Sequence, residues 1–306
     1  MNCACSTSKK PCDVGRSVCR APAKVNLFLK VTGKRPDGYH LLRSLMCPVD
    51  WYDHLELEPG GRGIRVVCSH PQVPGDRRNL VWKAADIFRR DLAARTGQKL
   101  DGIAIRLEKN IPVGAGLGGG SSDAAAVLKM LNQLWGRPFS KSRLRSMALA
   151  LGADVPFFLE DGPCLAAGVG EQLTPVRGLR SKPLVILYPH VAVSTAEVFK
   201  NLNLGLTKNP ERLKYHHFDG FEIHDFCRLG NDLEKVTLVR YPEVAEARKA
   251  LMRQGAVAVR MSGSGSAVFG LFQADDDARK AGRILGRETG WRVFVGKLLA
   301  DHPAGG

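Results

Sequence analysis

The sequence predicts an α+β protein of two domains, and three observations support this. The chain of 306 residues is longer than one hydrophobic core usually serves. Segments of alternating polarity, typical of strands, are mixed with segments of helical periodicity. The composition is 44% hydrophobic and 25% charged, as in ordinary globular proteins, and no apolar run reaches the roughly 20 residues that span a bilayer. We expect an N-terminal domain over residues 21–158, a C-terminal domain over residues 159–306, and no membrane partner.

Before these domains, the first 20 residues are rich in cysteine, with Cys3, Cys5, Cys12 and Cys19. Their spacing matches no paired C-x-x-C pattern, although a zinc knot is the alternative interpretation. No apolar stretch of signal-peptide length follows them. We interpret residues 1–20 as a disordered tail with free thiols and expect a reducing, cytoplasmic compartment.

Residues 21–31 are predicted to form the first strand. The alternation places one apolar set on one face and Lys24, Asn26, Phe28 and Lys30 on the other, as a half-buried strand requires. The turn-forming residues 35–38 follow, and a second strand is predicted over residues 53–58.

Helices and one more strand complete the expected N-terminal domain. A helix is predicted to open at Asn79 and to stop at Gly97, and residues 102–108 alternate as a strand does. Helical stripes follow over residues 124–135 and 141–151. In the second half, residues 183–189 form an apolar run typical of a buried strand, and two strands flank the Gly263–Ser266 turn.

The most unusual stretch lies between the predicted strand 102–108 and the following helix. Five glycines occur within Gly114–Gly120, and Ser121 and Ser122 come next, at the start of the helix. Glycines let backbone N–H groups approach an anion, and a helix N-terminus adds free donors and a positive dipole end. The stretch therefore predicts a phosphate-binding loop, with a ligand-free glycine-rich connection as the alternative.

Three named loop motifs fit this stretch poorly. The string G-x-G-x-x-G is present, but a helix follows where a dinucleotide-binding fold needs a strand. A Walker loop needs Lys after its last glycine, where this chain has Ser121. The H-R-D and D-F-G motifs of protein kinases do not follow.

The net charge of +15 favours an anionic partner, which includes nucleic acid, an anionic membrane surface and phosphorylated small molecules. A basic nucleic-acid-binding module predicts clustered Lys and Arg with interleaved aromatic residues. Here the basic residues are spread, and only 7% of residues are aromatic. We therefore expect small-molecule substrates and no nucleic acid.

The stretch PVGAGLGGGSSDAA resembles the phosphate loop of the kinases named for galactose, homoserine, mevalonate and phosphomevalonate. Five further segments resemble motifs of one branch of that family, in the same order: residues 21–29, 35–40, 152–158, 168–173 and 261–270. The resemblance runs from about residue 21 to 291. It implies a two-domain small-molecule kinase fold, in which an N-terminal two-layer α/β domain carries the loop and a smaller C-terminal domain is ferredoxin-like.

The resemblance also implies roles for particular residues. Lys24 would lie beside the transferring phosphoryl group, and Asp154 would be the base that accepts the hydroxyl proton. From the residues alone, Lys24 and Asn26 fit a solvated strand face and Asp154 fits a turn. The ATP-binding residues would be Pro112, Val113, Gly114, Ala115, Gly116, Leu117, Gly118, Gly119, Gly120, Ser121 and Ser122.

The same resemblance implies an acceptor site. Asn26 would bind substrate phosphates, Tyr39 and Phe199 would sandwich a cytosine base, and His40 would hydrogen-bond it; a core position is the alternative for Phe199. Mg²⁺ is expected with ATP, through the hydroxyl of Ser121 or Ser122, and no carboxylate is marked as its further ligand.

The implied reaction is ATP-dependent phosphorylation of the 2-hydroxyl of 4-diphosphocytidyl-2-C-methyl-D-erythritol, giving the 2-phosphate and ADP, in non-mevalonate isoprenoid synthesis. A homoserine-type or mevalonate-type kinase is the alternative enzyme. We expect a monomer or a weak homodimer.

Overall fold

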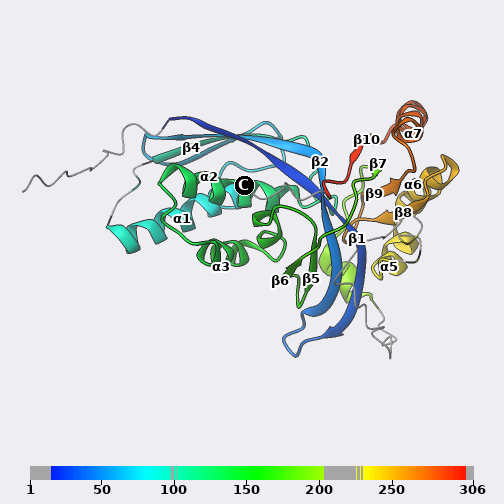
Figure 1. Ribbon diagram of the computed structural model, residues 1–306, viewed down its shortest axis with the longest axis horizontal. Coiled ribbons are helices and arrows are strands. Elements are labelled where there is room, and N and C mark those ends of the chain that lie inside the picture. Colours follow the sequence, from blue (N-terminus) through cyan, green and yellow to red (C-terminus); the bar gives the residue numbers. More distant parts are fainter. Residues whose placement is uncertain are drawn as a thin grey trace, which may run out of the picture.

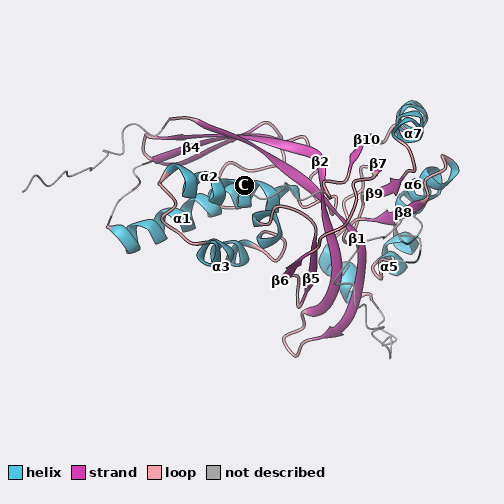
Figure 2. Cartoon of the chain, viewed as in Figure 1, coloured by secondary structure: helices cyan, strands magenta, loops and turns pink. Residues whose placement is uncertain are grey.

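The computed structural model describes residues 15–97, 100, 102–202, 225, 228 and 230–300. The chain forms two lobes, each built on one sheet with helices packed against it (Figures 1 and 2). Two long strands of the first lobe run from its far end to the second lobe, so that they connect the two parts physically. This arrangement confirms the expected two-lobed α+β fold.

The first sheet is organised around a long antiparallel hairpin, β1 (Ser17–Lys34) and β2 (His40–Pro59). One part of β2 also pairs with β4, and another part pairs with β5. The remaining strands extend the sheet outward from these two, in the order β3-β4-β2-β5-β6. Their bounds are β3 (Gly63–Cys68), β4 (Gly102–Glu108), β5 (Cys164–Ala167) and β6 (Gln172–Pro175).

Two helices, α1 (Leu80–Thr96) and α2 (Gly119–Leu134), pack against the first sheet, and α3 (Lys141–Leu151) packs against these two helices. Both predicted ends of α1 are confirmed. The Asn79 side chain accepts a hydrogen bond from the backbone N–H of Val81, and Gly97 ends the helix in the left-handed conformation with φ 70°. The short 3₁₀ helix η2 (Pro156–Leu159) follows α3.

The second sheet has the order β10-β7-β9-β8, with antiparallel pairing throughout. Helices lie between β7 and β8 and between β9 and β10, which is the ferredoxin-like arrangement that was expected. The elements of this lobe are β7 (Pro183–Tyr188), α4 (Thr195–Lys200), α5 (Glu234–Arg240), α6 (Pro242–Arg253), β8 (Ala258–Met261), β9 (Val268–Leu271), α7 (Asp275–Glu288) and β10 (Arg292–Lys297).

Strand β7 explains why residues 183–189 are so apolar. Leu184 and Ile186 join a core shared with β1 and β2, whereas Val185 and Leu187 join the core under α6 and α7. Successive side chains of a strand point to opposite faces, so both faces of β7 are covered. The prediction of a buried strand is confirmed.

The expectation of a half-buried first strand is wrong. Lys24, Asn26 and Phe28 are 3%, 4% and 0% exposed, although the pattern placed them on a polar face. The pairing register shifts between Asn26 and Phe28, and Phe28 packs in the same core as Leu27. The second lobe covers this part of the strand, which a one-strand pattern does not reveal.

Two boundaries also differ from expectation. Strand β2 begins at His40 rather than residue 53, because its residues 44–49 are all buried and show little alternation. Residues 17–20, expected in a disordered tail, are part of β1, and residues 1–14 lie outside the described residues. The division of the domains at residues 158/159 stays a prediction; β5 and β6, which follow it, pair within the first sheet.

Among the described residues, none of the helices combines the length and apolar character needed to cross a membrane.

Candidate active site

The glycine-rich loop connects β4 to α2, as predicted. Gly114, Gly116 and Gly118 have φ values of 69°, 78° and 72°, in the left-handed region that favours glycine. Helix α2 begins at Gly119, so the last glycines and both serines already belong to its first turn. The first N–H groups of a helix have no partner within it, so those of Gly119, Gly120 and Ser121 are available to an anion, whereas the Ser122 N–H donates to the Gly118 carbonyl at 2.9 Å.

Strand β1 lies directly against this loop. The backbone N–H of Lys24 donates to the carbonyl of Leu117 at 2.9 Å. A Cβ on residue 118 would stand 3.0 Å from Cγ of Lys24 and 2.9 Å from the ring of Phe158. Gly118 therefore allows the Lys24 side chain to pass close to the loop backbone.

The Gly263–Ser266 turn of the second lobe packs on the other side of the loop. The Ser262 hydroxyl donates to the Gly116 carbonyl at 2.9 Å, and the Ala267 N–H donates to the Ala115 carbonyl at 3.0 Å. A Cβ on residue 116 would stand 2.2 Å from the Ser262 carbonyl oxygen. The turn thus contacts the loop directly and is more than a hairpin connection.

Polar side chains of β1 and β2 form a buried chain of hydrogen bonds. Lys24 Nζ donates to Asn26 Oδ1 at 2.6 Å, and Asn26 Nδ2 donates to the Ser44 hydroxyl at 2.7 Å. The Ser44 hydroxyl in turn donates to the Phe28 carbonyl at 2.7 Å. Because a buried ammonium needs polar partners, these hydrogen bonds fix the position of the Lys24 side chain.

Asp154 faces Lys24 across the same site. Helix α3 ends at Gly152, and the short turn that follows brings Asp154 Oδ2 to 3.7 Å from Lys24 Nζ. The Asp154 side chain is 43% exposed, whereas that of Lys24 is 4% exposed. The carboxylate is therefore open to a ligand, with a held cation beside it.

A cavity of about 890 Å³ contains this pair. Residues from both lobes line it, and it runs from the Lys24–Asp154 pair to an aromatic group. It brings together all six residues that were predicted for catalysis and acceptor binding: Lys24, Asn26, Tyr39, His40, Asp154 and Phe199.

The aromatic group has a stacked pair at its centre. The rings of His40 and Phe199 lie 4.9 Å apart with an interplanar angle of 22°. Burial and the nearby Lys34 ammonium lower the pKa of His40, so its imidazole is neutral at pH 7. Tyr39 is 65% exposed at the rim. Phe199 lines the cavity, and it also packs against the core of the second lobe.

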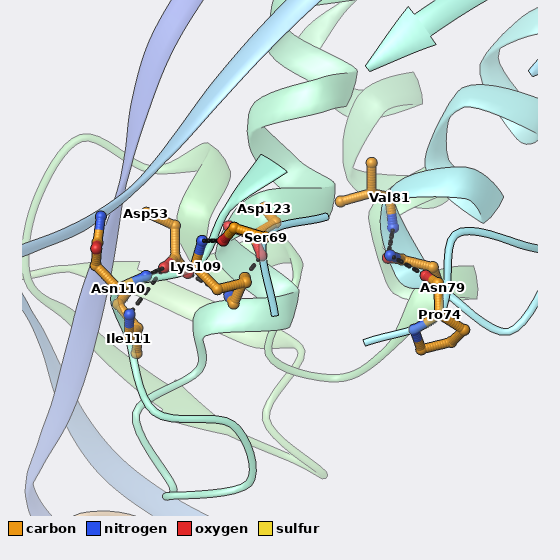
Figure 3. A network of polar contacts seen from close by, with 9 residues as sticks. All are labelled: Asp53, Ser69, Pro74, Asn79, Val81, Lys109, Asn110, Ile111 and Asp123. Carbon is orange, nitrogen blue, oxygen red and sulfur yellow. Dashed lines mark hydrogen bonds and ion pairs between the residues drawn. The ribbon is translucent and has the colours of Figure 1, made fainter. Parts of the chain in front are cut away.

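A second cavity, of about 360 Å³, lies along the loop. Gly116 and Ser121 line both cavities, so the loop separates two neighbouring hollows. Pro74, Asn79 and Leu80 line the second cavity opposite the loop, and Figure 3 shows Asn79 bonded to Pro74 and Val81 at this wall.

Not every loop residue faces a cavity. Leu117 packs in the core, and the Ser122 hydroxyl is buried without a hydrogen-bond partner. Of the two predicted magnesium ligands, Ser121 is the one that lines the cavities. Within the described part of the chain, no group of three or more His, Cys, Asp or Glu side chains is placed to hold a metal.

Several site residues were missed from the sequence. Ser44, which supports Asn26, and Thr195, which bonds Ser264 at 2.7 Å between their hydroxyls, carry no local signal. The ion pairs of Lys109 with Asp53 and Asp123, shown in Figure 3, were also missed. These contacts join strands and turns distant in sequence, so spacing does not reveal them.

Comparisons with known proteins place this geometry in a family. The model for the N-terminal domain of GHMP kinases matches residues 79–162, and that for the C-terminal domain matches residues 220–290. The chain is 45% identical over 275 residues to the 4-diphosphocytidyl-2-C-methyl-D-erythritol kinase of Geobacter sulfurreducens, covering 89% of this chain and 95% of that protein. The chain belongs to this kinase family.

Further members of this kinase family agree with the assignment. The same-named kinase of Geobacillus thermodenitrificans is 44% identical, over 92% of this chain and 97% of that protein. A crystal structure of 4-(cytidine 5'-diphospho)-2C-methyl-D-erythritol kinase has a TM-score of 0.75 at 38% identity, over 92% of this chain and 99% of that one.

More distant structures share the fold alone. The homoserine kinase of Cytophaga hutchinsonii has a TM-score of 0.70 at 20% identity, covering 98% of each chain.

The chain is an ATP-dependent small-molecule kinase, as its membership of the GHMP family entails.

Proposed function

We propose that this kinase transfers the γ-phosphoryl group of ATP to the 2-hydroxyl of 4-diphosphocytidyl-2-C-methyl-D-erythritol. One observation carries the proposal. A single cavity joins the Lys24–Asp154 pair, the edge of the phosphate loop and an aromatic group. Such a cavity suits an acceptor with a reacting hydroxyl at one end and a nucleobase at the other. Membership of a kinase family named for this acceptor supports the same reaction.

Asp154 and Lys24 have complementary tasks in this reaction. The Asp154 carboxylate accepts the proton of the acceptor hydroxyl while the hydroxyl oxygen attacks the γ-phosphorus. The bond between the γ-phosphorus and the β,γ-bridging oxygen breaks, and ADP leaves with that electron pair. The Lys24 ammonium, held by Asn26, stabilises the charge that develops on the transferring group.

The nucleotide is held by the loop and the cavity beside it. Backbone N–H groups of the loop and of the first turn of α2 bind the phosphates. We place the adenosine part in the second cavity, which the loop lines along with Pro74, Asn79 and Leu80. The phosphates then point past Ser121 towards Lys24, because Ser121 borders both hollows.

The acceptor base is recognised at the aromatic end. Phe199 and Tyr39 supply apolar rings for stacking, worth roughly 1–3 kcal/mol per base. His40 has a lowered pKa, so its neutral imidazole has one donor and one acceptor nitrogen for an uncharged base. His40 also stacks on Phe199, so the two rings form one surface for the base.

Mg²⁺ fits the hydroxyl at the junction of the cavities. The Ser121 hydroxyl lines both cavities, and Mg²⁺ prefers oxygen ligands shared with substrate phosphates. When bound, it neutralises charge on the β- and γ-phosphates. The Ser122 hydroxyl is buried and is the poorer candidate. Cytoplasmic location and a monomeric or weakly dimeric state stay predictions.

ADP release with Mg-ATP and a panel of acceptors tests this function. Turnover with the cytidyl acceptor and none with homoserine or mevalonate is expected. Turnover with one of the latter would retain the kinase chemistry and overturn the aromatic assignment. No ADP release with any of the three acceptors, together with a salt-sensitive mobility shift of RNA on binding the protein, would favour a nucleic-acid-binding module instead.

A further inference from the structure

The segment of residues 230–233, which precedes α5, is bonded to strand β1. The backbone N–H of Leu29 donates to the Gly230 carbonyl at 3.0 Å, and the N–H of Asp232 donates to the Leu29 carbonyl at 2.9 Å. The Asp232 carboxylate also accepts a hydrogen bond from the Val31 N–H at 3.0 Å. The segment is therefore fixed to the part of β1 that follows the buried chain of polar side chains.

Asn231 of this segment connects β1 to the Gly263–Ser266 turn. It is 4% exposed, and its Nδ2 donates to the Met261 carbonyl at 2.9 Å and to the Gly263 carbonyl at 2.7 Å. Asn231 Oδ1 accepts a hydrogen bond from the Leu233 N–H at 3.0 Å. The nitrogen of this amide thus supports the turn, whereas the oxygen supports the segment itself.

Helix α5 supplies a further donor to the same turn. Thr237 is 0% exposed, and its hydroxyl donates to the Ser264 carbonyl at 3.1 Å. Gly263 and Gly265 have φ values of 56° and 94°, and glycine backbone tolerates several conformations. Buried carbonyls need donors, so the side chains of Asn231 and Thr237 favour one conformation of this turn.

The position of the turn matters because the turn packs on the phosphate loop. The Gly116 carbonyl accepts the bond from the Ser262 hydroxyl, and a Cβ on Gly263 would stand 3.4 Å from the same oxygen. The loop is bonded back to β1 through the Lys24 N–H and the Leu117 carbonyl. Strand β1, the segment before α5, the turn and the loop therefore form a closed ring of contacts, which sets the distance between Lys24 and the loop.

We propose that Asn231 is a positioning residue: its amide fixes the turn on the phosphate loop and thereby holds the γ-phosphate of bound ATP at the Lys24 ammonium. Asn231 is not among the residues that line the two cavities, so it acts through the turn. Phosphoryl transfer depends on positioning, and a displacement of about 1 Å costs roughly 100-fold in rate. The proposal rests on the proposed function, because it takes the loop to bind ATP and Lys24 to stabilise the transferring group.

Steady-state kinetics of Asn231→Ala and Asn231→Asp, with Mg-ATP and the cytidyl acceptor, test the proposal. Asn231→Asp keeps an oxygen for the Leu233 N–H and loses the donor to the turn, so it separates support of the segment from support of the turn. We expect both variants to lower kcat about 10- to 100-fold, whereas the KM for the acceptor should stay within about threefold.

Asn132→Ala is the matched control. Asn132 is 7% exposed, and its amide bonds the Phe139 backbone at 3.1 and 3.0 Å, in the C-terminal half of α2. Its loss should also lower the unfolding temperature, yet kcat should stay near the wild-type value. Thr237→Val keeps the shape of the side chain and loses its donor to the turn, so kcat should fall severalfold. This variant decides the proposal if the Asn231 variants fail to fold.

A wild-type kcat in folded Asn231→Asp, or in Thr237→Val where neither Asn231 variant folds, would overturn the proposal. An equal loss of kcat in Asn132→Ala at equal stability would overturn it as well. Transfer by the wild type to homoserine or mevalonate alone would overturn the acceptor assignment, and the same variants assayed with that acceptor would then decide the role of Asn231. Absence of transfer to any acceptor would overturn both.

Discussion

The Lys24 side chain passes through space that a side chain at position 118 would fill. An ideal Cβ on Gly118 stands 3.0 Å from Lys24 Cγ, and the phenyl ring of Phe158 closes the other side at 2.9 Å. A contact under about 3.0 Å forces atoms to move. The buried position of the Lys24 side chain thus depends on the absence of a side chain at Gly118.

Gly118→Ala should therefore reduce activity, and Gly136→Ala should not. Both glycines have φ 72°, so each alanine substitution has the same conformational free-energy cost, about 1–2 kcal/mol, for a left-handed backbone. Only position 118 also pushes on Lys24, because position 136 has open space around its Cβ. Steady-state ADP release and thermal unfolding of both variants separate the two effects. Equal activity at equal stability would contradict the packing argument.

Lys24→Met should lower kcat by about 10²–10³-fold, because it removes a cation from a dry, preorganised site. The methionine is similar in length, so the buried volume is preserved. Asn26 loses its donor and keeps its bond to Ser44. Steady-state kinetics should show a smaller change in either KM than in kcat. An unchanged kcat would exclude Lys24 from the transition state.

Asp154→Asn should lower kcat by about 10²–10⁴-fold, the usual contribution of a general base. The amide has the shape of the carboxylate and no basic oxygen, so substrate binding should change little. Asp161→Asn is the matched control, since this exposed carboxylate pairs with the exposed Lys129 at 3.6 Å. Retention of near-wild-type kcat in Asp154→Asn would rule out this residue as the base.

Phe199→Ala should raise the KM for the cytidyl acceptor about 5- to 150-fold, the range that loss of one base-stacking ring predicts. The KM for ATP should not change, because Phe199 lines only the first of the two cavities. Phe199→Tyr keeps the ring and should stay close to wild type. A KM effect on ATP, or none on the acceptor, would refute the stacking role.

Stability should depend on pH through Asp123. Burial raises its pKa from the ordinary value of 3.8 to about 8 in the folded protein, so between these values only the folded state holds the proton. Stability from this group is full below about pH 4 and falls by up to about 1.4 kcal/mol per pH unit towards pH 8. Urea unfolding at several pH values should show this loss in wild type and not in Asp123→Asn. The same dependence of unfolding free energy on pH in the wild type and in Asp123→Asn would contradict this prediction.

Much of the fold follows from local sequence patterns. The boundaries of α1 and α3, the strand of residues 102–108 and the loop before α2 depend on caps, alternation and glycines within a short window. These signals are local, so one chain is enough to find them. The two strands around the Gly263–Ser266 turn are of the same kind.

The rest depends on packing between distant segments. Lys24 and Asn26 have the pattern of a solvated face, and they are buried because the second lobe and the loop cover β1. Residues 44–49 of β2 do not alternate in burial, because Leu45 and Met46 pack in different hydrophobic cores on the two faces of the strand. The Asp53–Lys109–Asp123 cluster joins β2, the end of β4 and the start of α2, and no spacing in the sequence indicates that contact.

The identity of the phosphorylated product tests the central claim most directly. Incubation with Mg-ATP and 4-diphosphocytidyl-2-C-methyl-D-erythritol, followed by phosphorus and carbon NMR, locates the new phosphate. We predict a monophosphate on the 2-hydroxyl, formed with one ADP per product by the wild-type protein and at a rate at least about 100-fold lower by Asp154→Asn. A phosphate at another hydroxyl, or ADP release without a phosphorylated acceptor, would contradict the account.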